Sequence, residues 1–301
     1  MKTILKILAL AGLSVASVQA LAALNIFACE PEWGTLAKEL GGDRVGVFTA
    51  TTALQDAHRV EARPSLIARA RNADLLLCTG SELEIGWVPL LLTQAGNSRI
   101  QAGAPGYLEA SQQVARIEIP QRVDRSQGDV HPGGNPHIQT DARNIARVAE
   151  ALAQRLAQLD PQNAADYKSR SQAFGARWQQ AIQRWERAGA RLKDMPVVVF
   201  HKDFSYLIRW MGMREAGSLE PRPGIPPTPA QLAALVEQMK RAPAKAILYA
   251  PYNDPRAAQF LSERTGIPAV MLPFTVGGSA KAGDLFGLFD ETISLLLEAS
   301  K

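Results

Sequence analysis

The chain has 301 residues, about twice the usual length of one domain, which predicts two domains. Hydrophobic residues make up 47% and charged residues 21%, a composition that excludes a disordered chain and allows a sizeable core. The formal net charge is +4 and falls to +2, from 31 Lys and Arg against 29 Asp and Glu, once Lys2 and Lys6 are left out with the N-terminal segment described next. Because the positive charges are scattered, the sequence predicts no nucleic-acid partner.

Residues 1–22 have the pattern of a secretory signal peptide. Lys2 and Lys6 stand before the apolar stretch 7–18, and small residues then follow at positions that suit cleavage. The stretch is short for a bilayer span of about 20 apolar residues, and no polar flank follows it, which argues against a membrane anchor. We therefore expect the mature chain to be an exported, soluble, periplasmic protein.

The chain contains only two cysteines, Cys29 and Cys78, and each ends a strand-like run. In an oxidising compartment such a pair favours a disulfide, and neighbouring strands of one parallel sheet bring their ends close enough to form it. The alternative is that both are small buried residues that do not touch. Acylation of Cys29, as in a lipoprotein, is disfavoured because this residue stands well beyond the apolar stretch.

Short apolar runs alternate with helix-period segments in the first part of the chain. The expected helix that begins at Pro64 has proline in its first turn, and Gly41 and Gly42 end the helix before it. Strands that alternate with helices predict βαβ units and a parallel sheet. The expected strands are 24–28, 45–49 and 74–78, and the expected helices are 33–40, 64–71 and 83–95.

The middle of the chain is helical, and the second half repeats the alternation of the first. Phe174, Trp178 and Ile182 recur at helical spacing in the long middle segment and form an apolar face for packing. Thr228 and Gln231 have the spacing of a capping box. In the second half, strands are expected at 197–200, 246–249 and 269–272, and helices follow Thr228, begin at 254–255 and span 284–297.

This pattern predicts an α/β fold with two similar parallel-sheet lobes joined by a long backbone helix. We expect an N-terminal lobe over residues 23–160, a connecting helix over 161–193 and a C-terminal lobe over 194–301. A crevice then lies between the lobes, and ligands of open α/β sheets bind beyond the carboxyl ends of the strands.

All four histidines of the chain fall outside the expected helices and strands. His58 and His201 follow strands, and His131 and His137 share one loop. Imidazole is the commonest ligand for borderline metals, and zinc takes three or four such ligands. The alternative for each histidine taken alone is a solvated loop residue, but their systematic placement favours a metal site between the lobes. The chain has no H-E-x-x-H motif of a zinc protease.

Three stretches resemble the TroA-like family, the periplasmic solute-binding proteins of ABC-type zinc and manganese importers. They span most of the mature chain in the family's order: Asp56-Ala57-His58 with Arg63-Pro64-Ser65 behind it, Gly134-Asn135-Pro136-His137 followed by Asp141, and residues 199–207, which contain His201. The resemblance implies that His58, His137 and His201 bind the metal between two lobes joined by a long helix.

The chain departs from the family at the fourth ligand, which is usually an Asp or Glu just after the last strand. That position reads Phe274-Thr275-Val276-Gly277-Gly278, and the next acid is Asp284. Asp284 suits the cap of the final helix better than a ligand role. His131 or water remains open as the fourth ligand, as does Asp284.

The ligand set favours zinc over manganese, because three imidazoles suit zinc whereas manganese prefers more oxygen ligands. The resemblance implies a monomeric carrier that delivers the metal to the membrane permease of an ABC importer. The alternatives are the manganese-binding counterpart of the same family, a structural zinc domain, and a secreted zinc hydrolase. In the hydrolase Glu61 or Asp203 would be the base, but each is more simply interpreted as a residue that holds a ligand.

Overall fold

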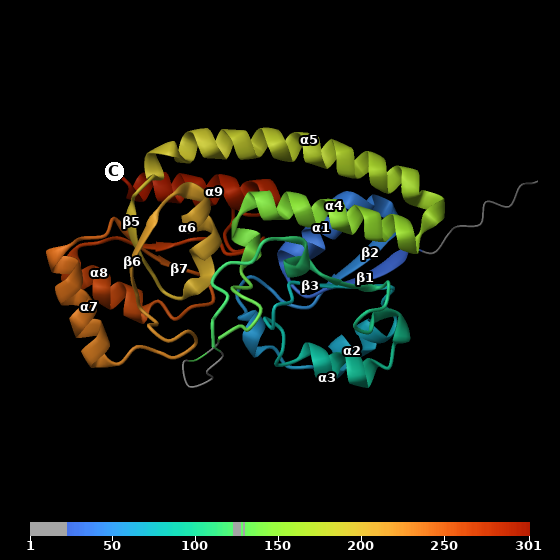
Figure 1. The fold of residues 1–301 in the computed structure, drawn as a ribbon, viewed down its shortest axis with the longest axis horizontal. Helices are drawn as coiled ribbons and strands as arrows, with labels where there is room; N and C mark the ends of the chain where they lie inside the picture. The colour runs from blue at the N-terminus through green and yellow to red at the C-terminus, as the bar shows by residue number, and fades with distance from the viewer. Residues whose placement is uncertain (1–22, 123–127, 129) are drawn as a thin grey trace, which may run out of the picture.

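The structure, a computed structural model, describes residues 23–122, 128 and 130–301. The predicted signal peptide, residues 1–22, lies outside the described residues. Two α/β lobes lie side by side, and one long helix runs along both of them (Figure 1).

The first lobe contains a four-stranded parallel sheet in the order β2-β1-β3-β4. The expected strand at 24–28 is confirmed as β1, and it pairs in register with β2 from Leu24 opposite Val45 onward. The strands are β1 (Leu24–Ala28), β2 (Val45–Thr49), β3 (Leu75–Cys78) and β4 (Tyr107–Glu109), and the helices are α1 (Pro31–Gly41), α2 (Pro64–Arg71), α3 (Val88–Ala95) and α4 (Ala142–Leu159).

The second lobe repeats this topology with the order β6-β5-β7-β8, again all parallel. The predicted capping box at Thr228 is confirmed, because its hydroxyl accepts from the backbone of Gln231, whose side chain accepts from the Thr228 backbone. The strands are β5 (Pro196–Val199), β6 (Arg214–Ser218), β7 (Ala246–Tyr249) and β8 (Ala269–Met271), and the helices are α6 (Ser205–Met211), α7 (Pro229–Arg241), α8 (Arg256–Thr265) and α9 (Leu285–Ala299).

Helices pack on both faces of each sheet, and successive residues of a strand point to opposite faces. Phe27 of β1 faces the cluster formed with α2 and α3, while Ile26 and Ala28 face a core shared with α4 and α5. In the second lobe Val198 faces α7 and α8 in the same way. The shared core is continuous from one lobe to the other, so it fixes the position of each lobe relative to the other.

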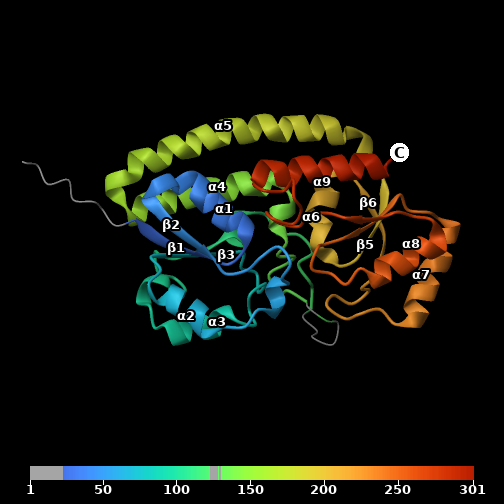
Figure 2. The same ribbon diagram turned by 180° about the vertical axis from the view of Figure 1, so that it is seen from behind.

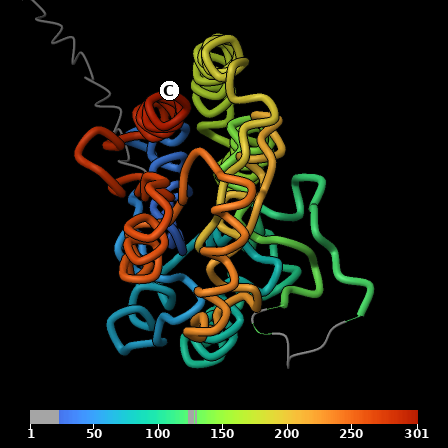
Figure 3. Tube along the Cα trace, turned by 90° about the vertical axis from the view of Figure 1, so that its left-hand side faces the viewer, coloured from blue at the N-terminus to red at the C-terminus, as the bar shows by residue number. Residues whose placement is uncertain are grey.

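The long helix α5 (Ala164–Gly189) is the main element of this shared layer and has 26 residues. Its aromatic stripe is buried: Trp178 packs between Phe174 and Trp185, and its indole nitrogen donates to the carbonyl of Ala142 at 2.8 Å. The stripe is therefore core packing, as its spacing indicated. Seen from behind and along the molecule, α9 lies beside α5 on the same side of both sheets (Figures 2 and 3).

The main difference from the sequence prediction lies in the expected helix over 83–95, which begins only at Val88. Pro89 stands in its first turn, and proline is tolerated there because that turn needs no N–H donor. The residues before it form turns, and Ser81 and Glu82 have positive φ angles of 52° and 64°. The loop after β3 is therefore longer than predicted.

No helix within the described parts of the chain is both long and apolar enough to cross a membrane.

Candidate metal centre

The structure brings three of the four histidines together in the crevice between the lobes. The ligand atoms of His58, His137 and His201 all lie within 4.8 Å of one another. Their ring centroids are 5.6 Å apart for His58 and His137, 6.1 Å for His58 and His201, and 5.6 Å for His137 and His201. Since they come from three separate segments, only the folded arrangement of both lobes assembles this cluster.

His58 lies in a short 3-10 turn in the loop that follows β2. The Asp56 carboxylate caps this turn, because its Oδ1 accepts from the backbone N–H of His58 at 3.0 Å and lies 2.7 Å from the ring Nδ1. On the other side the indole of Trp87 donates to the carbonyl of Ala57 at 3.0 Å. The loop after β3 thus holds the His58 segment in place.

His137 is held by the preceding asparagine and is only 1% exposed. The Oδ1 atom of Asn135 accepts from the backbone N–H of His137 at 2.9 Å. Gly134 has a φ angle of 93°, and a Cβ there would stand 2.7 Å from the carbonyl oxygen of Ile117. In the Gly-Asn-Pro-His motif, the glycine therefore allows the loop to pack against Ile117, and the asparagine side chain holds the backbone of His137.

His201 stands directly after β5, where the chain leaves the second sheet. Its Nδ1 lies 3.0 Å from Oε2 of Glu220, which follows β6. The same carboxylate oxygen accepts from the backbone N–H of Gly224 at 2.9 Å. Glu220 thus orients the ring in the way that carboxylates orient metal-binding histidines.

Each of the three histidines has a carboxylate beside it. For His137 this is Asp203, whose Oδ1 lies 3.7 Å from Nε2 and accepts from the hydroxyl of Tyr252 at 2.6 Å. Asp203 is fully buried, and its Oδ2, like both ring nitrogens of His137, has no hydrogen-bond partner among the described residues. Buried polar groups without partners are costly, so this pair indicates a place for a ligand that binds them.

The histidines of the cluster differ in the direction in which their pKa values are shifted. Burial, together with the neighbouring His201, His58 and His131, holds the pKa of His137 well below its ordinary value. Burial also lowers the pKa of His201, but the charges of Asp203, Glu220 and Asp56 outweigh it and raise this pKa overall. His137 thus stays neutral, the form that ligates metal, whereas His201 binds a proton more readily.

The fourth histidine borders the cluster. His131 Nε2 lies 3.1 Å from His58 Nε2, and burial, with the charges of His58 and His201, lowers the pKa of His131 to about 4. His131, His137 and His201 line a cavity of about 250 Å³ together with Lys202 and Glu118.

The structure shows the positions of three acids whose roles the sequence left open. Asp284 caps α9, as predicted, because its carboxylate accepts from the backbone N–H of Gly287 at 2.7 Å. Glu61 is exposed, whereas Asp203 is buried beside His137. Phe274, the first residue of the stretch 274–278 where the family usually supplies an acid, packs its ring 5.4 Å from that of His137.

Glu220 was missed by the sequence analysis. It follows β6, a strand that was not predicted because Arg214-Glu215-Ala216-Gly217-Ser218 has no apolar run. No local signal pointed to it, and only the pairing of β6 with β5 places it beside His201.

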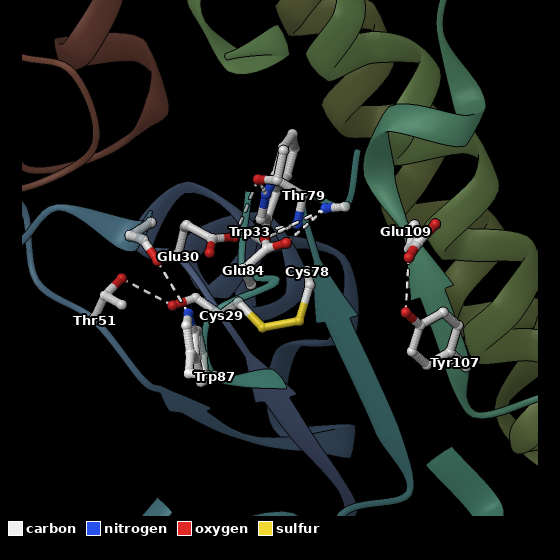
Figure 4. Close-up of a disulfide and its surroundings, with 12 residues drawn as sticks. Cys29, Glu30, Trp33, Thr51, Cys78, Thr79, Glu84, Trp87, Tyr107 and Glu109 are labelled. Atoms are coloured by element: carbon white, nitrogen blue, oxygen red, sulfur yellow. Dashed lines mark hydrogen bonds between the residues drawn. A yellow bond between two sulfur atoms is a disulfide. The ribbon is translucent and has the colours of Figure 1, made fainter. Parts of the chain in front are cut away.

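Cys29 and Cys78 form a disulfide, which decides between the two alternatives for the cysteines. It joins the carboxyl ends of β1 and β3, where buried acids surround it (Figure 4). Glu84 accepts from the backbone N–H groups of Thr79 and Gly80, and burial raises its pKa to about 7. The disulfide and Glu84 together fix the start of the loop that reaches His58 through Trp87.

The chain is similar to metal-binding components of ABC transporters. A profile of the family described as "Zinc-uptake complex component A periplasmic" matches residues 26–299. A metal ABC transporter substrate-binding lipoprotein, SloC of Streptococcus mutans serotype c, is 24% identical over 270 residues, covering 87% of this chain and 85% of its own.

Other relatives are named for other metals. The manganese ABC transporter substrate-binding lipoprotein scaA of Streptococcus gordonii is 23% identical and covers 93% of this chain and 91% of its own. The iron ABC transporter substrate-binding lipoprotein MtsA of Streptococcus pyogenes serotype M1 is 22% identical and covers 87% and 84%.

Among solved structures, the crystal structure of ZnuA is similar in fold, with a TM-score of 0.78 and 20% identity, over 93% of this chain and 100% of that one. This similarity confirms the predicted two-lobed architecture. Because the family profile covers nearly the whole described chain, the protein belongs to the ZnuA and TroA family: it is the extracytoplasmic metal-binding component of an ABC importer and not an enzyme.

Proposed function

We propose that this protein captures zinc in the periplasm, as a monomer, and delivers it to the membrane permease of its importer. His58, His137 and His201 are the ligands. The observation that carries this assignment is the convergence of three imidazoles, with ligand atoms within 4.8 Å of one another, at the carboxyl ends of the two sheets.

The charges around the cluster suit a dication. Asp56 and Glu220 each lie within 3.0 Å of the Nδ1 of a histidine, so these two rings present Nε2 to the metal. Asp203 adds a third carboxylate next to His137 and is the one of the three that is fully buried. Carboxylates beside neutral imidazoles offset the charge of a dication, which a neutral ligand does not require.

The chemistry of the donors favours zinc over manganese or iron. Imidazole nitrogen is a good ligand for zinc, whereas manganese prefers carboxylate, carbonyl and water oxygens. The stretch 274–278, where the family usually supplies an acidic ligand, contains no carboxylate in this chain. The zinc-uptake description of the matching family points the same way, although relatives named for manganese and iron share the fold.

A free periplasmic form fits this chain better than the lipid-anchored form named for the streptococcal relatives. Lipid anchoring uses a cysteine, and both cysteines of this chain are bonded to each other. Cys29 is also completely buried at the end of β1.

Metal content measured on the native protein tests this proposal. The protein is purified from the periplasm without added metal and analysed by mass spectrometry, and zinc, manganese and iron are then compared in competition titrations. We expect one zinc per chain and the tightest binding for zinc. Bound manganese or iron in place of zinc would contradict the metal assignment, and a metal-free protein that does not take up zinc would contradict capture itself.

A further inference from the structure

His131 and His58 are in direct contact through the nitrogens that face the site. The distance between the two Nε2 atoms is 3.1 Å, and the ring centroids are 5.1 Å apart. A hydrogen bond at this distance requires one ring to donate and the other to accept.

The hydrogen bond of His58 to Asp56 fixes the tautomer of His58. Nδ1 of His58 lies 2.7 Å from the Asp56 carboxylate, which only accepts, so this nitrogen carries the proton. Neutral His58 then has a lone pair at Nε2. This lone pair, which the proposed function assigns to the metal, faces Nε2 of His131 at 3.1 Å.

The spacing of the two nitrogens also suits two ligands of one metal. Nitrogens that bind one tetrahedral zinc at about 2.0–2.1 Å lie about 3.3 Å from each other. The observed 3.1 Å is close to this value, and His131 lines the same cavity as His137 and His201. The ligand atoms that lie within 4.8 Å of one another are those of His58, His137 and His201, so the ring of His131 has to move toward His137 and His201 to bind the same ion.

We propose that His131 is the fourth metal ligand, so that zinc is held by four imidazoles; this inference rests on the proposed function. The ring of His131 would bind the ion as the neutral tautomer with its proton on Nδ1, which leaves a lone pair on Nε2 for the metal. A fourth nitrogen in place of an oxygen strengthens the preference for zinc over manganese.

Two of the other polar groups nearby are engaged elsewhere. Asp284 caps α9, and the hydroxyl of Thr275 is hydrogen bonded to Glu32. Asp203 is the nearest rival: its Oδ1 accepts from the hydroxyl of Tyr252 at 2.6 Å, but its Oδ2 has no hydrogen-bond partner among the described residues. In this arrangement Asp203 supplies charge next to His137 while His131 supplies the fourth bond.

Cobalt substitution with chemical rescue tests this assignment. Co²⁺ is bound to the parent protein and to His131→Gly, and the visible spectrum, which reports the ligands and geometry of the ion, is recorded before and after addition of imidazole. We expect His131→Gly to change the spectrum and to weaken zinc binding at least about tenfold, with manganese binding nearly unchanged. Free imidazole should restore the parent spectrum by filling the vacated position.

Pro132→Ala is the matched control, because Pro132 follows His131 in the same loop, its side chain is exposed, and it does not line the cavity. It should leave the spectrum and the zinc affinity as in the parent. His131→Gln, which keeps a polar side chain but no imidazole, should behave as His131→Gly does and respond to imidazole less.

The outcomes are distinguishable. If the parent protein binds neither zinc nor cobalt, the proposed function fails. If the parent binds both and His131→Gly has the parent's spectrum and affinity, only the role of His131 is overturned. A spectrum altered by Asp203→Asn and not by His131→Gly would assign the fourth position to Asp203 instead.

Discussion

The side-chain amide of Asn135 donates to the backbone carbonyl of Lys202 at 2.9 Å, and this bond joins the segment that carries His137 to the one that carries His201. The same amide nitrogen lies 2.8 Å from Glu118, while its oxygen accepts from the backbone of His137. One side chain therefore sets the relative position of two proposed ligands on different segments.

Replacement of Asn135 by Asp should weaken zinc binding about 10–100-fold, the usual effect of removing a group that orients a ligand. Aspartate still accepts from His137, but it cannot donate to Lys202 and brings a negative charge next to Glu118. Competition titration against a chromogenic chelator measures the change. Asn72→Asp, at the exposed end of α2, is the control and should bind as the parent does.

Zinc affinity should fall as the pH is lowered, because a metal-binding imidazole must be neutral. The pKa of His201 is raised, since nearby acids outweigh its burial, so this ring keeps its proton to a higher pH than a free histidine. Affinity is therefore highest above that pKa and is lost as the pH falls through it, beginning above the reference value of about 6.5.

Titrations between pH 5 and pH 8.5 test this expectation. Glu220→Gln removes one of the charges that raise the pKa of His201, so in this variant the fall should begin at a lower pH. An affinity that is flat down to about pH 5 would speak against binding by imidazole.

Loss of the disulfide should destabilise the protein more than it affects the metal site. The bond joins residues 49 apart in the sequence, and removal of such a native disulfide costs about 2–5 kcal/mol. The variant with Cys29→Ala and Cys78→Ala should melt at a lower temperature than the oxidised parent. Reductant should lower the melting temperature of the parent and leave that of the double variant unchanged, and an equal response of both would contradict this.

Asp284→Asn should be nearly silent in both stability and zinc affinity, because Asn caps a helix about as well as Asp. Asp284→Ala should cost about 1 kcal/mol of stability through loss of the bond to Gly287, without a loss of affinity. Thermal melts and zinc titrations of the two variants check this. Weaker zinc binding in Asp284→Asn would instead make Asp284 a ligand.

The sequence predicted the elements with strong local signals. The apolar run that forms β1, the proline that starts α2 and the capping box at Thr228 all lie where the pattern placed them. Edge strands β4 and β6 were missed because one has only three residues and the other lacks an apolar run. Their pairing partners, and not their own residues, make them strands.

The site, too, was predicted only in part from the sequence. His58 follows the edge strand β2 and His201 follows the buried strand β5, and the parallel topology sends both to one crevice. The roles of Glu220, Asp203 and Asn135 depend on contacts between segments far apart in the chain, and no spacing in the sequence reports such contacts.

Zinc titration of the single variants His58→Ala, His137→Ala and His201→Ala tests the account most directly. The parent should bind one zinc, and each variant should lose more affinity than the roughly 10–100-fold expected for a residue that only orients a ligand, while its circular dichroism spectrum stays that of the parent. If all three variants bind zinc as the parent does, the metal site lies elsewhere and the account is wrong.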